Sequence, residues 1–259
     1  MITVGIDVGG SATKIAAFRE DGRLMSPLFV RATDPVTSVY GALGRFTAEN
    51  NVRLEDIHSI MVTGAGGAYV GEELYGRPCV HVSEFESVGR GGLYLSELNR
   101  AIVVSMGTGT ALVYAQSGEK SEYLGGTGVG GGTLVGLSRL LLGMEDLSHV
   151  ADMALSGDLS HVDLMVSDIT RRGDKLGLRQ DMTAANFGDL AEDATPADLA
   201  AGVVNLVLQA IGTMTVLACQ SCRTQTVILT GSMTTLDQAE PNFAAFQKLY
   251  GIRYIIPEN

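Results

Sequence analysis

The sequence has few of the residues that stabilise extracellular proteins. Its 259 residues include no tryptophan and only three cysteines, Cys79, Cys219 and Cys222. Three cysteines do not make a disulfide framework, and this favours a reducing compartment. The first ten residues, MITVGIDVGG, lack a basic segment followed by a long apolar run, so they do not resemble a signal peptide. We therefore expect a cytoplasmic protein.

Basic residues and uninterrupted hydrophobic runs are also scarce. Eighteen Lys and Arg residues stand against 29 Asp and Glu residues, a formal net charge of −11. So acidic a surface repels nucleic acid and anionic lipid. The most apolar window, residues 203–218, carries Asn205, Gln209 and Thr213 at four-residue spacing, which indicates the polar face of a buried helix rather than a membrane span. We expect a protein that acts on a small molecule, with no nucleic-acid or membrane partner.

Glycine, in contrast, is abundant and clustered. The 33 glycines fall in short runs, which is typical of backbone that bends sharply or approaches a ligand closely. Two runs each separate a pair of short apolar strands, 2–7 from 14–18 and 101–106 from 111–115. This recurrence indicates two related α/β lobes facing each other.

We place the lobe boundary near residues 96–100, which gives an N-terminal lobe of 1–98 and a C-terminal lobe of 99–259. Further strands are expected at 28–32, 57–64, 79–84, 226–231 and 253–256, and helices at 35–50, 66–74, 133–143, 147–156, 161–171, 196–220 and 239–250. Residues 172–186 are expected to form a loop.

The first glycine turn predicts a phosphate site. In Asp7-Val8-Gly9-Gly10-Ser11-Ala12-Thr13-Lys14, consecutive backbone N–H groups would point into one concavity, which suits an anion. Ser11 and Thr13 would add hydroxyl donors, Lys14 a positive charge, and Asp7 a ligand for Mg²⁺. The turn lacks the following helix of a P-loop or a dinucleotide fingerprint. An ordinary tight hairpin remains the alternative.

Two further glycine segments lie in the second half of the chain. Gly107-Thr108-Gly109-Thr110 occupies the matching place there and would hold other phosphates of a nucleotide, across a cleft from the first turn. The run 125–132 precedes an apolar helix, whose positive N-terminus would face an anion. A flexible loop is the alternative for this run. Gly231-Ser232 ends a buried strand, where glycine would let an adenine or ribose approach, although a plain strand-to-helix turn explains it equally.

Phosphorylating an alcohol also requires a general base. Glu84 and Glu86 stand at the end of the strand CVHVSE, and Glu84 would project into the cleft. Taken alone, both fit solvated turn carboxylates.

The motifs together resemble the type II pantothenate kinases. GIDVGGSATKI, VTGAGGA, the glutamate of SEFES, SMGTGT, GGTGVGGGTLVGLS and DMTAANFG occur in that family's order and span nearly the whole chain. The resemblance implies an actin-like (ribonuclease H-like) fold of two lobes, with a mixed sheet and flanking helices in each. It also implies ATP and Mg²⁺ as cosubstrates, a homodimer, and phosphorylation of pantothenate in the first step towards coenzyme A.

Carried over by position, the resemblance makes Glu84 the catalytic glutamate. It assigns nucleotide or phosphate contacts to Asp7 (also the metal ligand), Gly9, Gly10, Ser11, Thr13, Lys14, Gly107, Thr108, Gly109, Thr110, Gly128, Gly130, Gly131, Gly132, Gly231 and Ser232. It assigns contacts with pantothenate or pantetheine to Tyr123, Gly125, Gly126 and Thr127.

The sequence departs from the family in two places. Many members have an arginine just before the glycine-rich loop, where this chain has Tyr123, which donates a hydrogen bond but has no charge. Lys14 is a candidate for the missing charge. The family also continues past the last strand with a glycine- and alanine-rich helix, whereas this chain stops at Asn259. We interpret this as truncation.

Three alternative functions share the expected fold. Dehydratase activators bridge an iron–sulfur cluster between subunits, and the C-x-x-C pair Cys219 and Cys222 invites that comparison. No further cysteine pairs accompany it, however, and both thiols fit small buried hydrophobes of a helix. An N-acetylhexosamine kinase usually offers an aspartate base, and a non-catalytic actin-like protein would need no base at Glu84. The four histidines show no metal-binding spacing.

Overall fold

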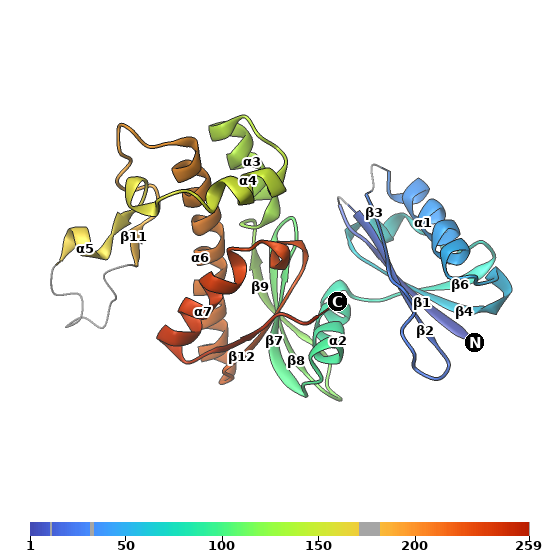
Figure 1. Cartoon of the computed structure of the whole chain (residues 1–259). Helices are drawn as coiled ribbons and strands as arrows, with labels where there is room; N and C mark the ends of the chain where they lie inside the picture. The colour runs from blue at the N-terminus through green and yellow to red at the C-terminus, as the bar shows by residue number, and fades with distance from the viewer. Residues whose placement is uncertain (11, 32–33, 171–181, 259) are drawn as a thin grey trace. The chain divides into compact units, whose positions relative to one another are not determined.

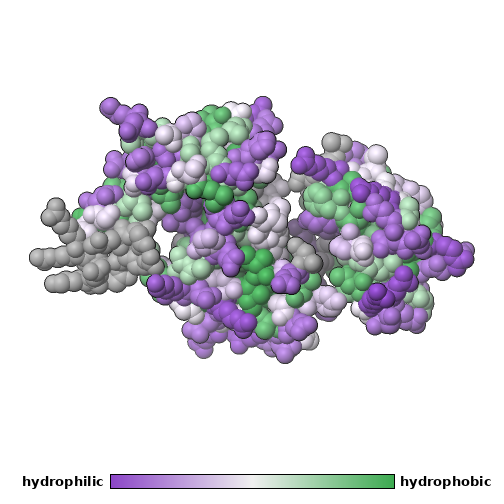
Figure 2. Space-filling model, viewed as in Figure 1, coloured by the Kyte–Doolittle hydropathy of each residue, from purple (hydrophilic) through white to green (hydrophobic). Residues whose placement is uncertain are grey.

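The computed structural model describes residues 1–10, 12–31, 34–170 and 182–258 (Figure 1). The chain divides into two compact units, Met1–Arg90 and Gly91–Asn259. The division lies within helix α2 (Glu84–Ser96), whereas the lobe boundary drawn from the sequence follows that helix. The lobes as bounded from the sequence remain a prediction. Hydrophilic residues cover much of the surface seen in Figure 2, as the charge composition leads one to expect.

Unit 1 is built on a six-stranded sheet in the order β3-β2-β1-β4-β6-β5. Its elements are β1 (Ile2–Val8), β2 (Ala12–Arg19), β3 (Leu28–Arg31), α1 (Pro35–Glu49), η1 (Leu54–Asp56), β4 (Ile57–Thr63), η2 (Ala65–Tyr69), β5 (Glu73–Leu74) and β6 (Arg77–His81). β1 and β2 form an antiparallel hairpin, and β4 runs parallel to β1. Alternate residues of β1, Val4, Ile6 and Val8, are fully buried or nearly so, which fixes the face that packs in the core.

Helix α1 covers that buried face. The Asp34 side chain caps the helix by accepting a hydrogen bond from the Thr37 N–H at 2.7 Å, and Pro35 fits the first turn because that position needs no intrahelical N–H donor. Leu43 and Phe46 of α1 are fully buried in the same core cluster as β1. The opposite face of β1 therefore remains available to the site described below.

Unit 2 repeats the strand order of unit 1. Its five-stranded sheet has the order β13-β12-β7-β8-β9, in which β7 and β8 form an antiparallel hairpin and β12 runs parallel to β7. The strands are β7 (Arg100–Met106), β8 (Thr110–Gln116), β9 (Glu122–Thr127), β12 (Thr226–Thr230) and β13 (Arg253–Ile255), and a small separate sheet pairs β10 (Leu164–Met165) with β11 (Thr183–Ala185). The duplication predicted from the two glycine turns is thus present in the topology.

The long helix α6 (Pro196–Cys222) packs against β7, β8 and β12 of this sheet, and α7 (Ala239–Tyr250) contacts β13. The other helices of unit 2 that follow β9 are α3 (Gly131–Leu142), α4 (Leu147–Ala154), η3 (Leu159–His161), α5 (Val166–Ile169) and η5 (Ser232–Thr235). Among the described residues, α6 is long and apolar enough to cross a membrane, but 61% of its apolar window is buried within the protein, and its side chains form much of the core of unit 2. Asn205, expected on the polar face of this helix, is buried, and its amide donates to the buried Asp163 carboxylate at 2.8 Å.

Four sequence predictions differ from the structure. The helix expected at 66–74 is the short 3-10 helix η2 followed by strand β5, because its glycines disfavour an α-helix. The helix expected at 161–171 is broken into η3, β10 and α5. Strand β6 ends at His81, before Glu84, and β9 takes in the first residues of the 125–132 run. Most of the expected loop 172–186 lies outside the described residues.

Candidate active site

The turn between β1 and β2 brings a carboxylate and an ammonium together. Asp7 pairs with Lys14 across the hairpin, and the Lys14 Nζ lies 2.9 Å from Asp7 Oδ2. The Gly9 N–H donates to the Ala12 carbonyl at 2.9 Å and so closes the turn. Both charged side chains retain solvent exposure, 33% for Asp7 and 56% for Lys14, so a ligand can reach them. Ser11, predicted to bind phosphate, lies outside the described residues.

The two faces of this hairpin have different roles. Val8 and Thr13 are paired and both are buried on the core face, whereas Asp7 and Lys14 lie on the opposite face. The Thr13 hydroxyl is buried without a hydrogen-bond partner among the described residues. The side chain of Thr13 is therefore not presented on the face that carries Asp7, and the role predicted for it as a hydroxyl donor to phosphate lacks support.

A second strand end meets Asp7 on its own face. Thr63, the last residue of β4, pairs with Asp7 in parallel register. Gly64 follows with φ +87°, and a β-carbon there would lie 2.5 Å from Asp7 Oδ1 and 2.6 Å from the Val8 carbonyl oxygen. Any residue larger than glycine at position 64 would collide with the Asp7 carboxylate. The sequence did not lead us to Thr63 or Gly64, although the VTG of β4 repeats the LTG of β12.

The turn of unit 2 is held by the helix that follows the glycine-rich segment. Within the turn, the Gly107 N–H donates to the Gly109 carbonyl at 2.9 Å. The first N–H groups of α3, those of Gly131 and Gly132, donate to the carbonyls of Gly107 and Thr108, each at 2.8 Å. These two donors are engaged within the chain, so the expectation that the α3 N-terminus faces an anion needs correction at both residues.

Threonine hydroxyls tie the glycine-rich segment to the sheet. Thr110 Oγ1 donates to the Val129 carbonyl at 2.8 Å, and Thr127 Oγ1 accepts from the Val129 N–H at 3.1 Å. Thr133 Oγ1 donates to the Gly128 carbonyl at 2.8 Å. The hydroxyls of Thr110 and Thr127, both predicted to contact ligands, thus hold the segment in shape. Thr108 is exposed on the turn.

The glycines of the predicted site differ in whether the fold itself requires them. A β-carbon on Gly130 would lie 2.8 Å from the Gly109 carbonyl carbon and 2.9 Å from the Thr108 carbonyl oxygen. Among the residues that the structure describes, a β-carbon on Gly10 or on Gly128 would meet no atom within 4 Å, and neither residue has positive φ. Because the fold does not require glycine at these two positions, a close approach of a ligand is a reason for it.

The predicted acceptor residues lie on β9. Tyr123 is 47% exposed, and its hydroxyl would lie 2.8 Å from a β-carbon on Gly126. The ladder shifts register next to these residues, because Leu112 pairs with Gly125 and Val113 with Tyr123. Tyr123 is therefore presented at the surface beside a backbone that can accept no larger residue at Gly126.

Gly231 of unit 2 corresponds to Gly64 of unit 1. It follows β12 with φ +97°, and a β-carbon there would overlap the Met106 carbonyl oxygen. Ser232 begins η5 and is exposed. The plain strand-to-helix turn, which the sequence left open as the explanation for this glycine, accounts for Gly231 by backbone contact alone.

The two candidate bases differ in their surroundings. Glu84 is the first residue of α2 and is exposed, and its side chain makes no hydrogen bond or ion pair with any described residue. Glu86 is largely buried, with 15% of its side chain exposed, and forms an ion pair with Arg90. Glu84 is thus the carboxylate that is free to accept a proton.

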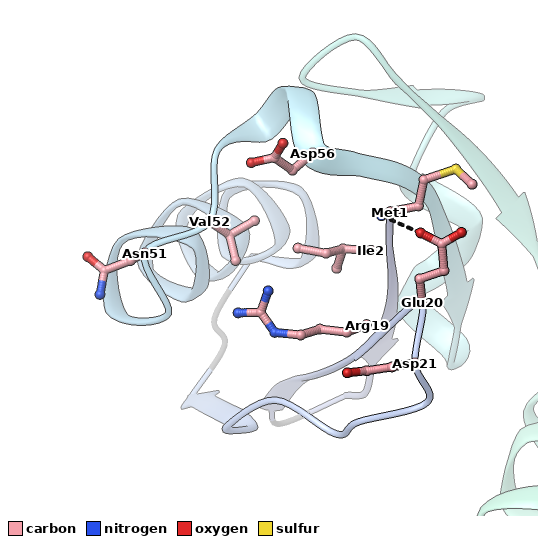
Figure 3. Close-up of a pocket in the computed structure, with 8 residues that line it drawn as sticks. All are labelled: Met1, Ile2, Arg19, Glu20, Asp21, Asn51, Val52 and Asp56. Atoms are coloured by element: carbon pink, nitrogen blue, oxygen red, sulfur yellow. Dashed lines mark hydrogen bonds and ion pairs between the residues drawn. The ribbon is translucent and has the colours of Figure 1, made fainter.

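Two hollows formed by described residues of unit 1 do not include Asp7 in their lining. One of about 410 Å³ lies at the opposite end of β1, where Figure 3 shows the amino group of Met1 paired with Glu20. The other, of about 530 Å³, is a mainly apolar depression on the sheet face that carries Asp7, and its lining includes Gly5, Ala16 and Phe18.

The C-x-x-C pair lies at the end of α6. Burial raises the pKa of the Cys219 thiol to about 11, and burial also raises the pKa of Cys222. A thiol with a raised pKa is a poor nucleophile and a poor metal ligand at neutral pH. The interpretation as a small buried hydrophobe fits Cys219, whereas Cys222 is only partly buried against the same core.

Comparison with known proteins identifies the family. A model of the family described as Fumble matches residues 95–246. The type II pantothenate kinase of Staphylococcus haemolyticus is 32% identical over 238 residues, which are 88% of this chain and 84% of that protein. The chain belongs to the type II pantothenate kinase family. The type II pantothenate kinase of Bacillus cereus is 29% identical over 239 residues, 89% of this chain and 83% of that protein.

Solved structures establish the actin-like fold predicted for this type II pantothenate kinase family member. The activator of 2-hydroxyisocaproyl-CoA dehydratase from Clostridium difficile, solved with ADPNP, has a TM-score of 0.66 at 14% identity, covering 100% of this chain and 89% of that one. The ROK hexokinase from Thermus thermophilus has a TM-score of 0.52 at 12% identity, covering 98% and 92%. At these identities the likeness concerns the fold alone. Both the family and the fold expected from the motifs are therefore confirmed.

Proposed function

We propose that this chain transfers the γ-phosphoryl group of ATP to the primary hydroxyl of pantothenate, giving 4′-phosphopantothenate in the first step of coenzyme A biosynthesis. The observation that carries the proposal is its membership of the type II pantothenate kinase family over 88% of its length. The charged turn at Asp7 and Lys14, and the unpaired carboxylate of Glu84, supply the residue types that the reaction needs.

ATP phosphates are assigned to the glycine turns of the two units. Gly9 and Gly10 in unit 1, and Gly107 to Gly109 with Gly128 in unit 2, offer backbone that a phosphate can approach. Lys14, which is 56% exposed beside the turn of unit 1, would add a positive charge for a phosphate oxygen, and Gly231 with Ser232 is assigned to the adenosine. Gly130, Gly131 and Gly132 would act indirectly, by shaping the backbone of the turn.

Asp7 fits a magnesium ion that arrives with the nucleotide. Mg²⁺ is usually bound by one or two carboxylates, by water and by substrate phosphates. Asp7 offers one carboxylate: its Oδ2 is held by Lys14 at 2.9 Å, and its Oδ1 lies over Gly64. When bound, the ion would neutralise negative charge on the phosphates.

Glu84 is the proposed general base. As the pantothenate hydroxyl oxygen bonds to the γ-phosphorus, its proton passes to Glu84, and the bond from that phosphorus to the β–γ bridging oxygen breaks to release ADP. Tyr123, Gly125, Gly126 and Thr127 are assigned to the acceptor. Because Tyr123 is uncharged, we propose that Lys14 stabilises the developing charge on the transferring phosphate.

The test compares Glu84→Gln with Glu86→Gln in an ADP-release assay. Pantothenate, pantetheine, an N-acetylhexosamine and no acceptor are supplied in turn. We expect turnover of the unaltered protein with pantothenate or pantetheine, a loss of about 10²- to 10⁴-fold in Glu84→Gln, and retained ATP binding. Glu86→Gln should keep most of the activity, because Glu86 is paired with Arg90.

Three outcomes count against the proposal. Normal turnover of Glu84→Gln would remove the base. Turnover only with the hexosamine would make the protein a sugar kinase, and steady hydrolysis without acceptor would favour an activator-type ATPase.

We further propose that the protein is a cytoplasmic homodimer subject to feedback by coenzyme A thioesters. Light scattering, and inhibition of the same assay by acetyl-CoA, test the last two points.

A further inference from the structure

The duplication makes Thr63 and Thr230 equivalent residues. Each is the last residue of the strand that runs parallel to the first strand of its unit, and each precedes a glycine with φ near +90°. In unit 1, Thr63 pairs with Asp7, and in unit 2, Thr230 pairs with Ser105. Any difference between the two threonines therefore reflects their surroundings rather than their place in the fold.

The two hydroxyls are used differently. Thr230 Oγ1 donates to the Val104 carbonyl at 3.0 Å, so in unit 2 the neighbouring strand β7 provides the hydrogen-bond partner of the hydroxyl. Thr63 Oγ1 is buried and has no hydrogen-bond partner among the residues that the structure describes. A buried hydroxyl without a partner is unfavourable, and such a group in a folded protein calls for an explanation.

The neighbour of Thr63 supplies that explanation. Asp7 lies on the same face and in the same register, and Gly64 closes the backbone against Asp7 Oδ1. Lys14 already holds Asp7 Oδ2. The register therefore places the Thr63 hydroxyl, which donates and accepts, one strand away from the Asp7 carboxylate, which accepts, on the same face of the sheet.

We propose that Thr63 is a positioning residue for the magnesium ion of the bound nucleotide, and that its hydroxyl holds a water of the ion's hydration shell beside Asp7. Mg²⁺ keeps several waters when it binds to a protein, and residues that orient its ligands contribute to its affinity. The inference rests on the proposed function only in requiring that the chain binds ATP with magnesium. It assigns a difference between the two units: the hydroxyl of unit 1 serves a ligand, whereas that of unit 2 serves the fold.

The experiment titrates magnesium into the protein at a fixed ATP concentration, with no acceptor present. Calorimetry measures the binding. Thr63→Val replaces the hydroxyl by a methyl group of nearly the same size. We expect it to weaken the apparent magnesium affinity about 10- to 100-fold, and to leave ATP binding in EDTA unchanged. Thr63→Ser should restore the magnesium affinity. Thr230→Val, the matched control, should lower the thermal midpoint and leave the magnesium dependence intact.

Unchanged magnesium affinity in both Thr63→Val and Thr63→Ala would overturn the inference, as would an equal effect of Thr230→Val. A wild-type protein that binds ATP equally with and without magnesium would overturn it too. The assay needs no acceptor, so magnesium-dependent binding without pantothenate turnover would contradict the proposed function and leave the inference standing. Normal pantothenate turnover by the unaltered protein, together with an unaltered magnesium response in Thr63→Val, would support the proposed function and contradict the inference.

Discussion

A single set of alanine substitutions should distinguish glycines that the fold requires, which would lose stability, from glycines that a ligand requires, which would lose affinity. A methyl group added at Gly10 or at Gly128 would meet open space, whereas one added at Gly130 would not. We therefore expect Gly10→Ala and Gly128→Ala to keep stability and lose nucleotide affinity, and Gly130→Ala to lose stability first.

The magnitudes follow from the contacts. A methyl group on Gly130 would meet backbone atoms of Thr108 and Gly109 at 2.8 to 2.9 Å, and backbone cannot rotate away as a flexible side chain can. Overpacking of this kind costs about 1–3 kcal/mol. At roughly 2–4 °C per kcal/mol for a chain of this size, the thermal midpoint should fall by several degrees. Alanine at Gly10 or Gly128 should change stability by less than about 1 kcal/mol, in either direction.

Binding provides the second measurement. A methyl group at Gly10 or Gly128 that keeps a phosphate away from the backbone should cost about tenfold in ATP affinity, which is about 1.4 kcal/mol. Gly136→Ala is the control, because Gly136 lies in α3 with open space around it and outside the proposed site. Calorimetry and thermal unfolding of the four variants test the argument. Unchanged ATP affinity in both Gly10→Ala and Gly128→Ala would refute it, as would destabilisation of these variants equal to that of Gly130→Ala.

Two further predictions follow from titratable groups of unit 2. Hydrogen bonds from the backbone amides of Asp158 and Thr195 lower the pKa of Asp198, and the hydrogen bond to Asp198 raises the pKa of His161. The Asp198 contribution to stability should therefore disappear as the pH falls below about 3.9, and the His161 contribution should disappear as the pH rises above about 6.5. The thermal midpoint of the unaltered protein should then decline above pH 6.5, and this decline should be absent in His161→Asn. An unchanged decline in the variant would contradict the assignment. Because burial raises the pKa of Cys219 to about 11, that thiol should react with a disulfide reagent only after unfolding; rapid labelling of the native protein, read by mass spectrometry, would show that it is accessible.

The parts of the fold that could be predicted from sequence are those set by local patterns. In the strand–glycine–strand units at Asp7 and at Gly107, β1 buries alternate residues and β7 buries a continuous run, and both are visible in the sequence as apolar stretches interrupted by a turn. Helix α1 was also predictable, because Asp34 and Pro35 mark its start and its apolar residues recur at helical spacing. The family resemblance added the order of the motifs.

The parts that could not be predicted depend on contacts between distant segments. The sequence shows that Thr110 and Thr127 stand near glycines, but not that their hydroxyls hold the backbone of Val129. It places Glu84 after a strand, but not at the start of α2 with Glu86 paired to Arg90. Hydrogen-bond partners are chosen by tertiary structure, so the residue types that could bind a ligand outnumber those left free to do so.

The two units share a topology but not a distribution of charge, and this difference bears on the mechanism. Across the hairpin of unit 1, Asp7 faces Lys14, whereas the equivalent pair in unit 2 is Ser105 and Ala111. In unit 2, two N–H groups at the start of α3 donate hydrogen bonds to carbonyls of the turn. In a chain of net charge −11, the phosphates of ATP would meet their fixed positive side chain in unit 1, and unit 2 would offer backbone dipoles. Lys14→Met should therefore weaken ATP binding in a salt-dependent manner, whereas substitutions in the turn of unit 2 should weaken it independently of salt. Equal salt dependence in both sets of variants would show that this division of roles is wrong.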